Sequence, residues 1–98
     1  MNLKNKKVII TGATGGIGNS LVKKFIEGGS IVLATGTKEE KLNNLKSKFS
    51  DLQIEKFNLA EHSKIETFIE SANNKLGGLD ILINNAGINL DSLTIRLT

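Results

Sequence analysis

The chain has 98 residues, of which 39% are hydrophobic and 23% charged, and its 13 Lys and Arg outnumber its 10 Asp and Glu to give a net charge of +3. This is the composition of one small globular domain, and no apolar run is long enough to span a membrane. Basic residues are spread along the chain without Tyr or Trp, so we expect no nucleic-acid partner. The absence of Cys and the single His62 exclude disulfides and leave no metal-binding cluster. We expect a cytoplasmic protein, because the apolar stretch after the basic N-terminus is too short for a signal peptide.

Short apolar runs alternate with amphipathic segments along the whole chain. The runs begin at Val8, Ile31, Ile54 and Ile81, and each interval has room for a loop and a helix. Three of the runs are nearly all apolar, as in strands buried on both faces of a parallel sheet, whereas the run from Ile54 is more polar and predicts an outer strand. The order β-α-β-α-β-α-β therefore predicts an α/β fold with a parallel sheet and helices on both faces.

The first strand is followed by a glycine-rich turn that leads into the first predicted helix. Four of its seven residues are glycine, and the turn comprises Gly12, Ala13, Thr14, Gly15, Gly16, Ile17 and Gly18. Glycines between a strand and its helix allow a pyrophosphate to approach the backbone at the helix N-terminus, so the turn predicts a dinucleotide site. The alternative is a plain tight turn with surplus glycine. A nucleotide triphosphatase loop is disfavoured, because no Gly-Lys-Ser/Thr follows. We expect Gly16→Val and Gly18→Val each to abolish binding.

The three predicted helices carry recognisable cores and ends. In the first, Ile17, Leu21 and Phe25 recur every four residues, and a pair of glycines ends the helix. Spacings typical of a capping box, Thr37 with Glu40 and Ser63 with Glu66, predict the starts of the second and third helices. Gly77-Gly78 closes the third helix before the fourth strand.

Two motifs resemble the signatures of the short-chain dehydrogenase/reductase family. Thr11-Gly12-x-x-x-Gly16-Ile17-Gly18 is similar to TGxxxGIG, and Asn84-Asn85-Ala86-Gly87 is similar to the NNAG after the fourth strand. The resemblance covers the whole chain. It implies a Rossmann-type sheet of strand order 3-2-1-4, incomplete relative to the family, in which residues 1–98 are the N-terminal part of one NAD(P)-binding domain with no second domain. The segment from Asn84 to Leu93 is most similar to NNAGITxDxL of bacterial 3-oxoacyl-[acyl-carrier-protein] reductases, although many related reductases share this half.

Cofactor choice depends on the end of the second strand, where NAD-dependent enzymes usually place an acid. Here the segment reads Ala34-Thr35-Gly36-Thr37-Lys38, so NADPH is expected rather than NADH, with Thr37 and Lys38 available to its 2′-phosphate. Against this, Thr14-Gly15 stands where NADP-dependent relatives often carry Arg or Lys, and Glu39 is close. The alternative for Lys38 is a solvated residue of the first helical turn.

The resemblance also implies which residues lie beside the adenosine of the cofactor. Asn58 and Leu59 would contact the adenine, and Asn85 and Ala86, with Gly87 of the same motif, would lie by the ribose. The alternative for Asn84 and Asn85 is a turn that ties neighbouring strands together.

No catalytic residue is predicted within this chain. The family uses Ser, Tyr-x-x-x-Lys and Asn beyond NNAG, with the Tyr as proton donor, and the chain has no Tyr. We therefore expect a fragment of a reductase of fatty acid synthesis, inactive alone, whose full-length form is a homo-oligomer acting on an acyl-carrier-protein-linked substrate. The alternative is a non-catalytic dinucleotide-binding or sensor module.

The last residues raise an expectation about assembly. Ile95-Arg96-Leu97 resembles the segment at the start of the next helix in the family. If so, the strand from Ile81 to Ile83 lies at an edge of the sheet with no protective charge, and the chain should self-associate through it.

Overall fold

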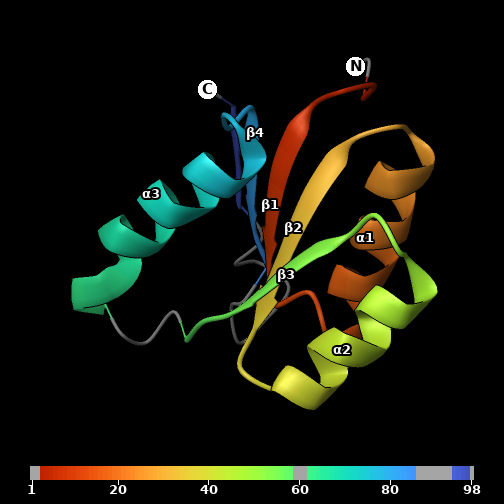
Figure 1. Cartoon of the computed structure of the whole chain (residues 1–98), viewed down its shortest axis with the longest axis horizontal. Helices are drawn as coiled ribbons and strands as arrows, with labels where there is room; N and C mark the ends of the chain where they lie inside the picture. The colour runs from red at the N-terminus through yellow and green to blue at the C-terminus, as the bar shows by residue number, and fades with distance from the viewer. Residues whose placement is uncertain (1–2, 59–61, 86–93, 98) are drawn as a thin grey trace.

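The computed structural model describes residues 3–58, 62–85 and 94–97. The elements alternate in the predicted order and are drawn in Figure 1: β1 (Lys7–Thr11), α1 (Gly16–Glu27), β2 (Ile31–Gly36), α2 (Glu39–Lys48), β3 (Gln53–Lys56), a short 3-10 turn (His62–Lys64), α3 (Ile65–Leu76), β4 (Ile81–Asn84) and β5 (Thr94–Leu97). The β-α-β-α-β-α-β order predicted from the sequence is confirmed, and β5 follows it.

The five described strands form one sheet in the order β3-β2-β1-β4-β5. β1 pairs in parallel with β2 and with β4, and β2 pairs in parallel with β3, which confirms the predicted order 3-2-1-4. Because these strands are parallel, their carboxyl ends meet at one edge, at the bottom of Figure 1. The turns that follow β1, β2, β3 and β4 therefore meet at the same edge.

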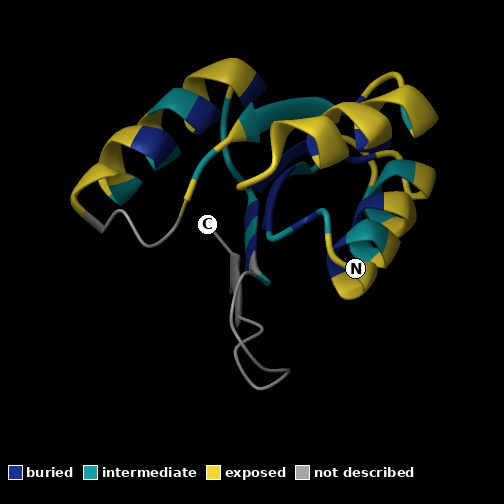
Figure 2. Cartoon of the chain, turned by 90° about the horizontal axis from the view of Figure 1, so that it is seen from below, coloured by how far each residue is buried: buried dark blue, intermediate teal, exposed yellow. Residues whose placement is uncertain are grey.

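Helices cover both faces of the sheet, with α1 and α2 on one side and α3 on the other (Figure 1). Alternate residues of β1 pack on the two faces of the sheet. Val8 and Ile10 lie in the core on the side of α1 and α2, and Ile9 lies in the core with Phe68 of α3. Figure 2 shows the buried residues concentrated on the sheet and the exposed ones on the outer faces of the helices. This two-sided burial explains why the inner strands are apolar throughout.

The helix ends partly differ from the sequence prediction. The glycine stops are confirmed, because Gly29 and Gly77 have φ of 89° and 75°, a conformation that glycine adopts without a Cβ clash. Both capping boxes are wrong: the N-cap residues are Lys38 and Lys64, and neither makes a side-chain cap hydrogen bond within the described part of the chain.

The C-terminal segment corrects a second expectation. Thr94–Leu97 is a strand, not the start of a helix, and it pairs antiparallel with β4 in the register Ile81↔Leu97. The strand Ile81–Asn84 therefore has neighbours on both sides, and the prediction that it is a bare edge is wrong. The reason is general: unpaired N–H and C=O groups along a strand accept any segment of the chain that can extend beside them.

Candidate functional site

The glycine turn connects the carboxyl end of β1 to α1 in a conformation that needs glycine at its first position. Gly12 has φ of 62°, in the left-handed region. Ala13 is fully buried, and its N–H donates to the Thr35 carbonyl at 3.0 Å, which fastens the turn to the end of β2. The Gly15 N–H donates back to the Gly12 carbonyl at 3.4 Å. One backbone hydrogen bond thus fastens the turn to β2, and the other closes the turn on itself.

Gly16 and Gly18, which the sequence analysis treated alike, occupy different environments. A Cβ on Gly18 would lie 2.3 Å from the Gly12 carbonyl oxygen and 2.7 Å from Ala13 Cα, so Gly18 permits the close packing of α1 on β1. A Cβ on Gly16 would have no described atom within 4 Å, and Gly16 is exposed. The space beside Gly16 is open to a ligand, whereas the space beside Gly18 is filled by the protein.

The N-terminus of α1 is open to an anion. Its N-cap, Gly15, has no side chain that could cap the helix, and the first turn has no acidic side chain. The first N–H groups of a helix lack intrahelical partners, and they attract phosphate groups together with the helix dipole. Ile17 lies here with 45% of its surface exposed, so it is not part of the buried core stripe predicted for α1.

A threonine hydroxyl links the glycine turn to the end of β4. Thr11 Oγ1 donates to the Ile83 carbonyl at 3.3 Å and accepts from the Asn85 N–H at 2.9 Å, and Thr11 is 2% exposed. The Asn85 side chain reaches the turn as well, since its Nδ2 donates to the Gly12 carbonyl at 3.3 Å. Asn85 therefore ties neighbouring strands together, which was the structural alternative for this residue, and it also lies beside the glycine turn.

A hollow lies at the carboxyl ends of β2 and β3, in addition to the open space beside Gly16. It is a pocket of about 480 Å³ lined by Thr37, Lys56, Phe57, Asn58 and Lys64. Two contacts shape it: the Phe57 N–H donates to the Gly36 carbonyl at 2.9 Å, and the Phe57 ring stacks on Phe68 of α3 with centroids 4.3 Å apart. These contacts hold the residue after Phe57, Asn58, on the same pocket wall as Thr37.

The structure brings most of the predicted site residues that it describes to the carboxyl end of the sheet. Asn85 contacts Gly12 and lies close to Gly18 of the turn, and Thr37 and Asn58 share the pocket. Lys38 is not among the pocket-lining residues. Leu59, Ala86 and Gly87 lie outside the described residues.

Sequence reasoning missed several residues at this edge. Gly36 is one of them. A Cβ on Gly36 would lie 3.2 Å from Thr14 Cγ2, so glycine at this position lets the turn pack closely against the end of β2. Lys56, Phe57 and Lys64 are others, since they line the pocket. The register of β2 with β3 is the only signal that could have placed Lys56 beside Gly36, and that register depends on long-range pairing.

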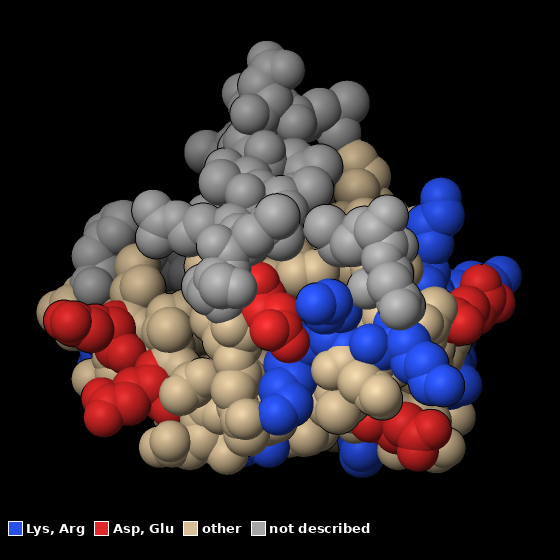
Figure 3. Space-filling view, turned by 90° about the horizontal axis from the view of Figure 1, so that it is seen from above, with Lys and Arg blue, Asp and Glu red and all other residues tan. Residues whose placement is uncertain are grey.

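Away from this edge, the described residues include a smaller hollow of about 360 Å³ on α3, lined by Thr67, Glu70, Ser71, Asn74 and Lys75. Figure 3 shows Lys and Arg interspersed with Asp and Glu at the opposite end of the sheet. In residues 3–58, 62–85 and 94–97, no group of three or more His, Cys, Asp or Glu side chains could hold a metal ion. None of the helices in the same residues is long and apolar enough to cross a membrane.

Comparison of the chain with known proteins identifies a matching family. The short chain dehydrogenase family matches residues 6–98. Three curated relatives are a 3alpha-hydroxysteroid dehydrogenase of Mediterraneibacter gnavus, 42% identical over 90% of this chain, a 3-oxoacyl-[acyl-carrier-protein] reductase of Rickettsia conorii, 40% identical over 99%, and an NADP-dependent 3-hydroxy acid dehydrogenase of Escherichia coli, 38% identical over 85%. The chain covers 38%, 39% and 34% of their respective lengths.

A solved structure shows the same fold. The crystal structure of a short chain dehydrogenase from Bacillus anthracis matches 89% of this chain and 37% of its own chain, with a TM-score of 0.78 and 33% identity. The parallel part of the sheet, in the order β3-β2-β1-β4, thus has the fold of that protein.

Proposed function

Because this chain belongs to the short-chain dehydrogenase family, we propose that it binds a nicotinamide dinucleotide across the carboxyl edge of its sheet, as the N-terminal part of one dinucleotide-binding domain. The observation that carries this proposal is the glycine turn, where the space beside Gly16 is open and the N-terminus of α1 has no side-chain cap among the described residues. Residues of this kind fit a pyrophosphate, which needs bare backbone and N–H donors.

Each part of the edge has a role in this proposal. The turn, from Gly12 to Gly18, would hold the pyrophosphate, and the residues proposed around the adenosine are Thr37, Lys38, Asn58, Leu59, Asn85, Ala86 and Gly87. When bound, the nicotinamide supplies the hydride for reduction of a carbonyl. This chain's own residues bind and orient: Thr11 and Asn85 keep the end of β4 against the turn, and Ile17 offers an apolar surface beside it.

The preferred cofactor in this proposal is NADPH. The end of β2 carries Gly36, Thr37 and Lys38, with no carboxylate to repel a 2′-phosphate. The E. coli relative is NADP-dependent by name, which supports the same choice. The carboxylate of Glu39 in the first turn of α2 is the feature that opposes it.

The proposed reaction of the full-length protein is reduction of 3-oxoacyl-[acyl-carrier-protein] to the 3-hydroxyacyl form, as a cytoplasmic homo-oligomer. It is supported by the similarity of residues 84–93 to the corresponding segment of such reductases, and by the name of the Rickettsia relative. The other relatives act on hydroxysteroids and 3-hydroxy acids by name, so the shared chemistry is interconversion of a carbonyl and a hydroxyl group.

Titration of the chain with NADPH and NADH tests the binding proposal. We expect NADPH to bind more tightly, and Gly16→Val to weaken both dinucleotides at least tenfold while the fold is retained, because the branched side chain enters the open space. Lys23→Gln, a surface change on the same helix, serves as the control and should leave both affinities unchanged. Retained affinity in a folded Gly16→Val variant would contradict the proposal.

A non-catalytic dinucleotide-binding or sensor module is the second candidate, because the chain has no Tyr to donate the proton. Both candidates predict that the 98 residues alone oxidise no NADPH in the presence of an acetoacetyl thioester. Turnover by this chain would show that its own residues complete the catalytic site. Turnover by a protein that contains this chain together with Ser and Tyr-x-x-x-Lys would decide for the reductase.

A further inference from the structure

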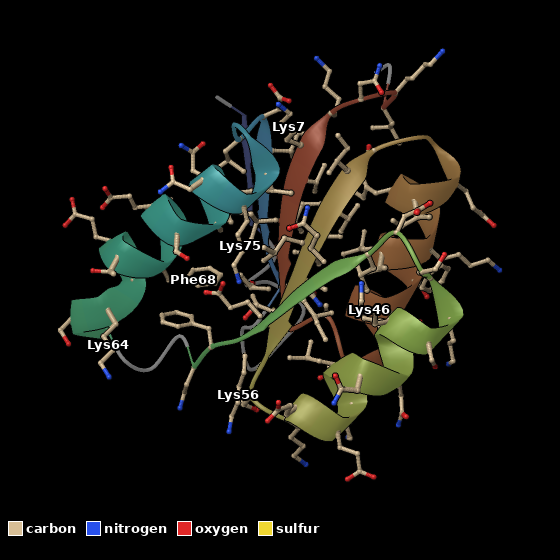
Figure 4. All side chains as sticks on the ribbon, viewed as in Figure 1. Lys7, Lys46, Lys56, Lys64, Phe68 and Lys75 are labelled. Carbon is tan, nitrogen blue, oxygen red and sulfur yellow. The ribbon has the colours of Figure 1, made fainter. Side chains whose placement is uncertain are left out.

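A serine hydroxyl lies on the helix face that begins at the glycine turn. Ser20 is exposed, and its Oγ donates to the Gly16 carbonyl at 3.1 Å. Residues four apart lie on the same face of a helix, and helical side chains lean toward the N-terminus. The hydroxyl therefore points back toward Gly16, whose outer side is open. Figure 4 shows side chains of α1 that extend away from the sheet.

Two lysines follow Ser20 along α1. Lys23 and Lys24 are three and four residues further on, both are exposed, and neither forms an ion pair with another described residue. Ammonium groups at these spacings can approach an anionic group on residue 20. The first turn of the helix contains no acidic side chain that would repel such a group.

The start of α1 is also the part of the helix that unwinds most easily. Its first three residues include Gly16 and Gly18, and the N-cap, Gly15, has no side chain that could cap the helix. Glycine gains more entropy than other residues when a helix unwinds, and helix ends open locally at a small free energy. An enzyme that acts on serine in an extended segment can therefore reach Ser20 while the sheet stays folded.

On the basis of the proposed function, we propose that Ser20 is a phosphorylation site whose phosphate closes the glycine turn to dinucleotides. A protein kinase transfers the γ-phosphoryl group of ATP to the hydroxyl. Ser20 Oγ forms a bond to phosphorus, and the bond from that phosphorus to the β,γ-bridging oxygen breaks. ADP leaves with the electron pair of the broken bond, and the hydroxyl proton passes to solvent. The phosphoserine carries close to two negative charges, which the ammonium groups of Lys23 and Lys24 stabilise.

The phosphate on Ser20 and a pyrophosphate would compete for the same region. Because a helical side chain covers the turn before its own Cα, the phosphate lies over the first turn of α1. That turn offers its free N–H groups to the pyrophosphate in the proposed site. Two anionic groups at this separation repel each other. The pyrophosphate is common to NADPH and NADH, so phosphorylation should weaken both to the same extent.

Titration of a chain that carries phosphoserine at position 20 tests the effect on binding. We expect NADPH and NADH each to bind roughly tenfold more weakly or worse than to the unmodified chain. Phosphoserine at position 47 is the matched control: Ser47 is exposed on α2 and its Oγ also donates to a backbone carbonyl, that of Asn44, so its phosphate adds the same charge away from the turn. This control and Ser20→Ala should leave both affinities unchanged. Circular dichroism establishes that each chain is folded.

Incubation of the chain with ATP and an extract of the cells that make it tests the modification itself. Mass spectrometry should locate a phosphate on Ser20, and saturating NADPH should slow its appearance, because the bound dinucleotide holds the first turn in its helical form.

Two results would overturn the assignment: full affinity of the folded phosphoserine-20 chain, or the absence of phosphate from residue 20 after incubation. Either result would leave dinucleotide binding intact. Failure of the unmodified chain to bind NADPH or NADH would instead contradict the proposed function, and the assignment would fall with it.

Discussion

At the scale of single residues, the glycines of the turn divide between packing and access. Gly18 lies where any Cβ would overlap the backbone of Gly12 and Ala13, whereas Gly16 faces open space. The protein itself needs glycine at position 18, whereas at position 16 only the proposed ligand would need it. Stability and binding measurements can therefore separate the two roles.

The first prediction follows from this difference. Gly18→Ala should lower the free energy of unfolding by about 1–3 kcal/mol or more, because the new Cβ would lie 2.3 Å from the Gly12 carbonyl oxygen. Gly16→Ala is the matched control and should leave stability unchanged or raise it by up to about 1 kcal/mol, since alanine loses less entropy in a helix. Urea denaturation measures both, and equal costs at the two positions would refute the distinction.

Thr11 and Thr35 offer a second contrast at this scale. Both are buried, at 2% and 1% exposure, but Thr11 Oγ1 has two strand-end partners, and Thr35 Oγ1 has no hydrogen-bond partner among the described residues. Thr11→Val should cost about 1–3 kcal/mol, because it leaves the Asn85 N–H unpaired, and Thr35→Val should be neutral or stabilising. Thermal unfolding of the two variants decides, and a larger loss for Thr35→Val would contradict this account.

At the scale of elements, α3 supports the pocket as well as the core. Phe68 packs on Ile9 and Leu33 of the sheet, and its ring stacks on Phe57, the residue before Asn58. The face-to-face stack has an interplanar angle of 10°. A change in α3 should therefore reach the pocket at the ends of β2 and β3 although the helix itself lies on the outside of the sheet.

The corresponding prediction uses one substitution on each face. Phe68→Leu removes the stack, worth about 0.5–1.5 kcal/mol beyond its buried area, and should also weaken NADPH binding severalfold. Phe49→Leu makes the same change on the α1 and α2 side, where Phe49 packs on the other core, and should lower stability without changing affinity. Affinity at a fixed folded fraction is the measurement. A parallel loss of affinity in both variants would mean that general destabilisation, not the stack, sets the pocket.

At the scale of the whole molecule, β5 covers one side of β4, which would otherwise be an unpaired strand at the edge of the sheet. It pairs with β4 over four residues, from Ile81↔Leu97 to Asn84↔Thr94. At the other edge, β3 is short and ends in a lysine, and Lys46 Nζ donates to the Leu52 carbonyl just before the strand begins. Short strands and lysines are features that discourage pairing with other chains.

We therefore expect removal of β5 to promote self-association. A chain shortened to residue 93 should sediment as dimers or larger species at concentrations where the 98-residue chain sediments as a monomer, because β4 would lose its partner. Replacing Arg96 by Pro, which cannot donate a hydrogen bond to the ladder, provides an independent disruption of the same pairing. Equal sedimentation of all three chains would show that β5 does not protect the edge.

The sequence by itself determined the features that depend on local chemistry. Apolar runs such as Val8–Ile10 predict buried strands, paired glycines at 28–29 and 77–78 predict helix ends, and the turn after β1 predicts a phosphate site, because each signal lies within a few neighbouring residues. The order of the four parallel strands also followed, through the family resemblance. The helix starts did not: the N-cap residues are Lys38 and Lys64, one residue after the Thr37 and Ser63 that the capping spacing predicts.

Only the tertiary structure decided what lies beside what. The pairing of Gly36 with Lys56, the stack of Phe57 on Phe68, the hydroxyl link from Thr11 to Asn85, and the addition of β5 to β4 all join residues that are distant along the chain. Such contacts depend on strand register and on how helices settle on a sheet, and a shift of register by one residue would turn each side chain to the other face. For this reason the glycine turn was visible in the sequence, whereas the pocket at the ends of β2 and β3 emerged only from the fold.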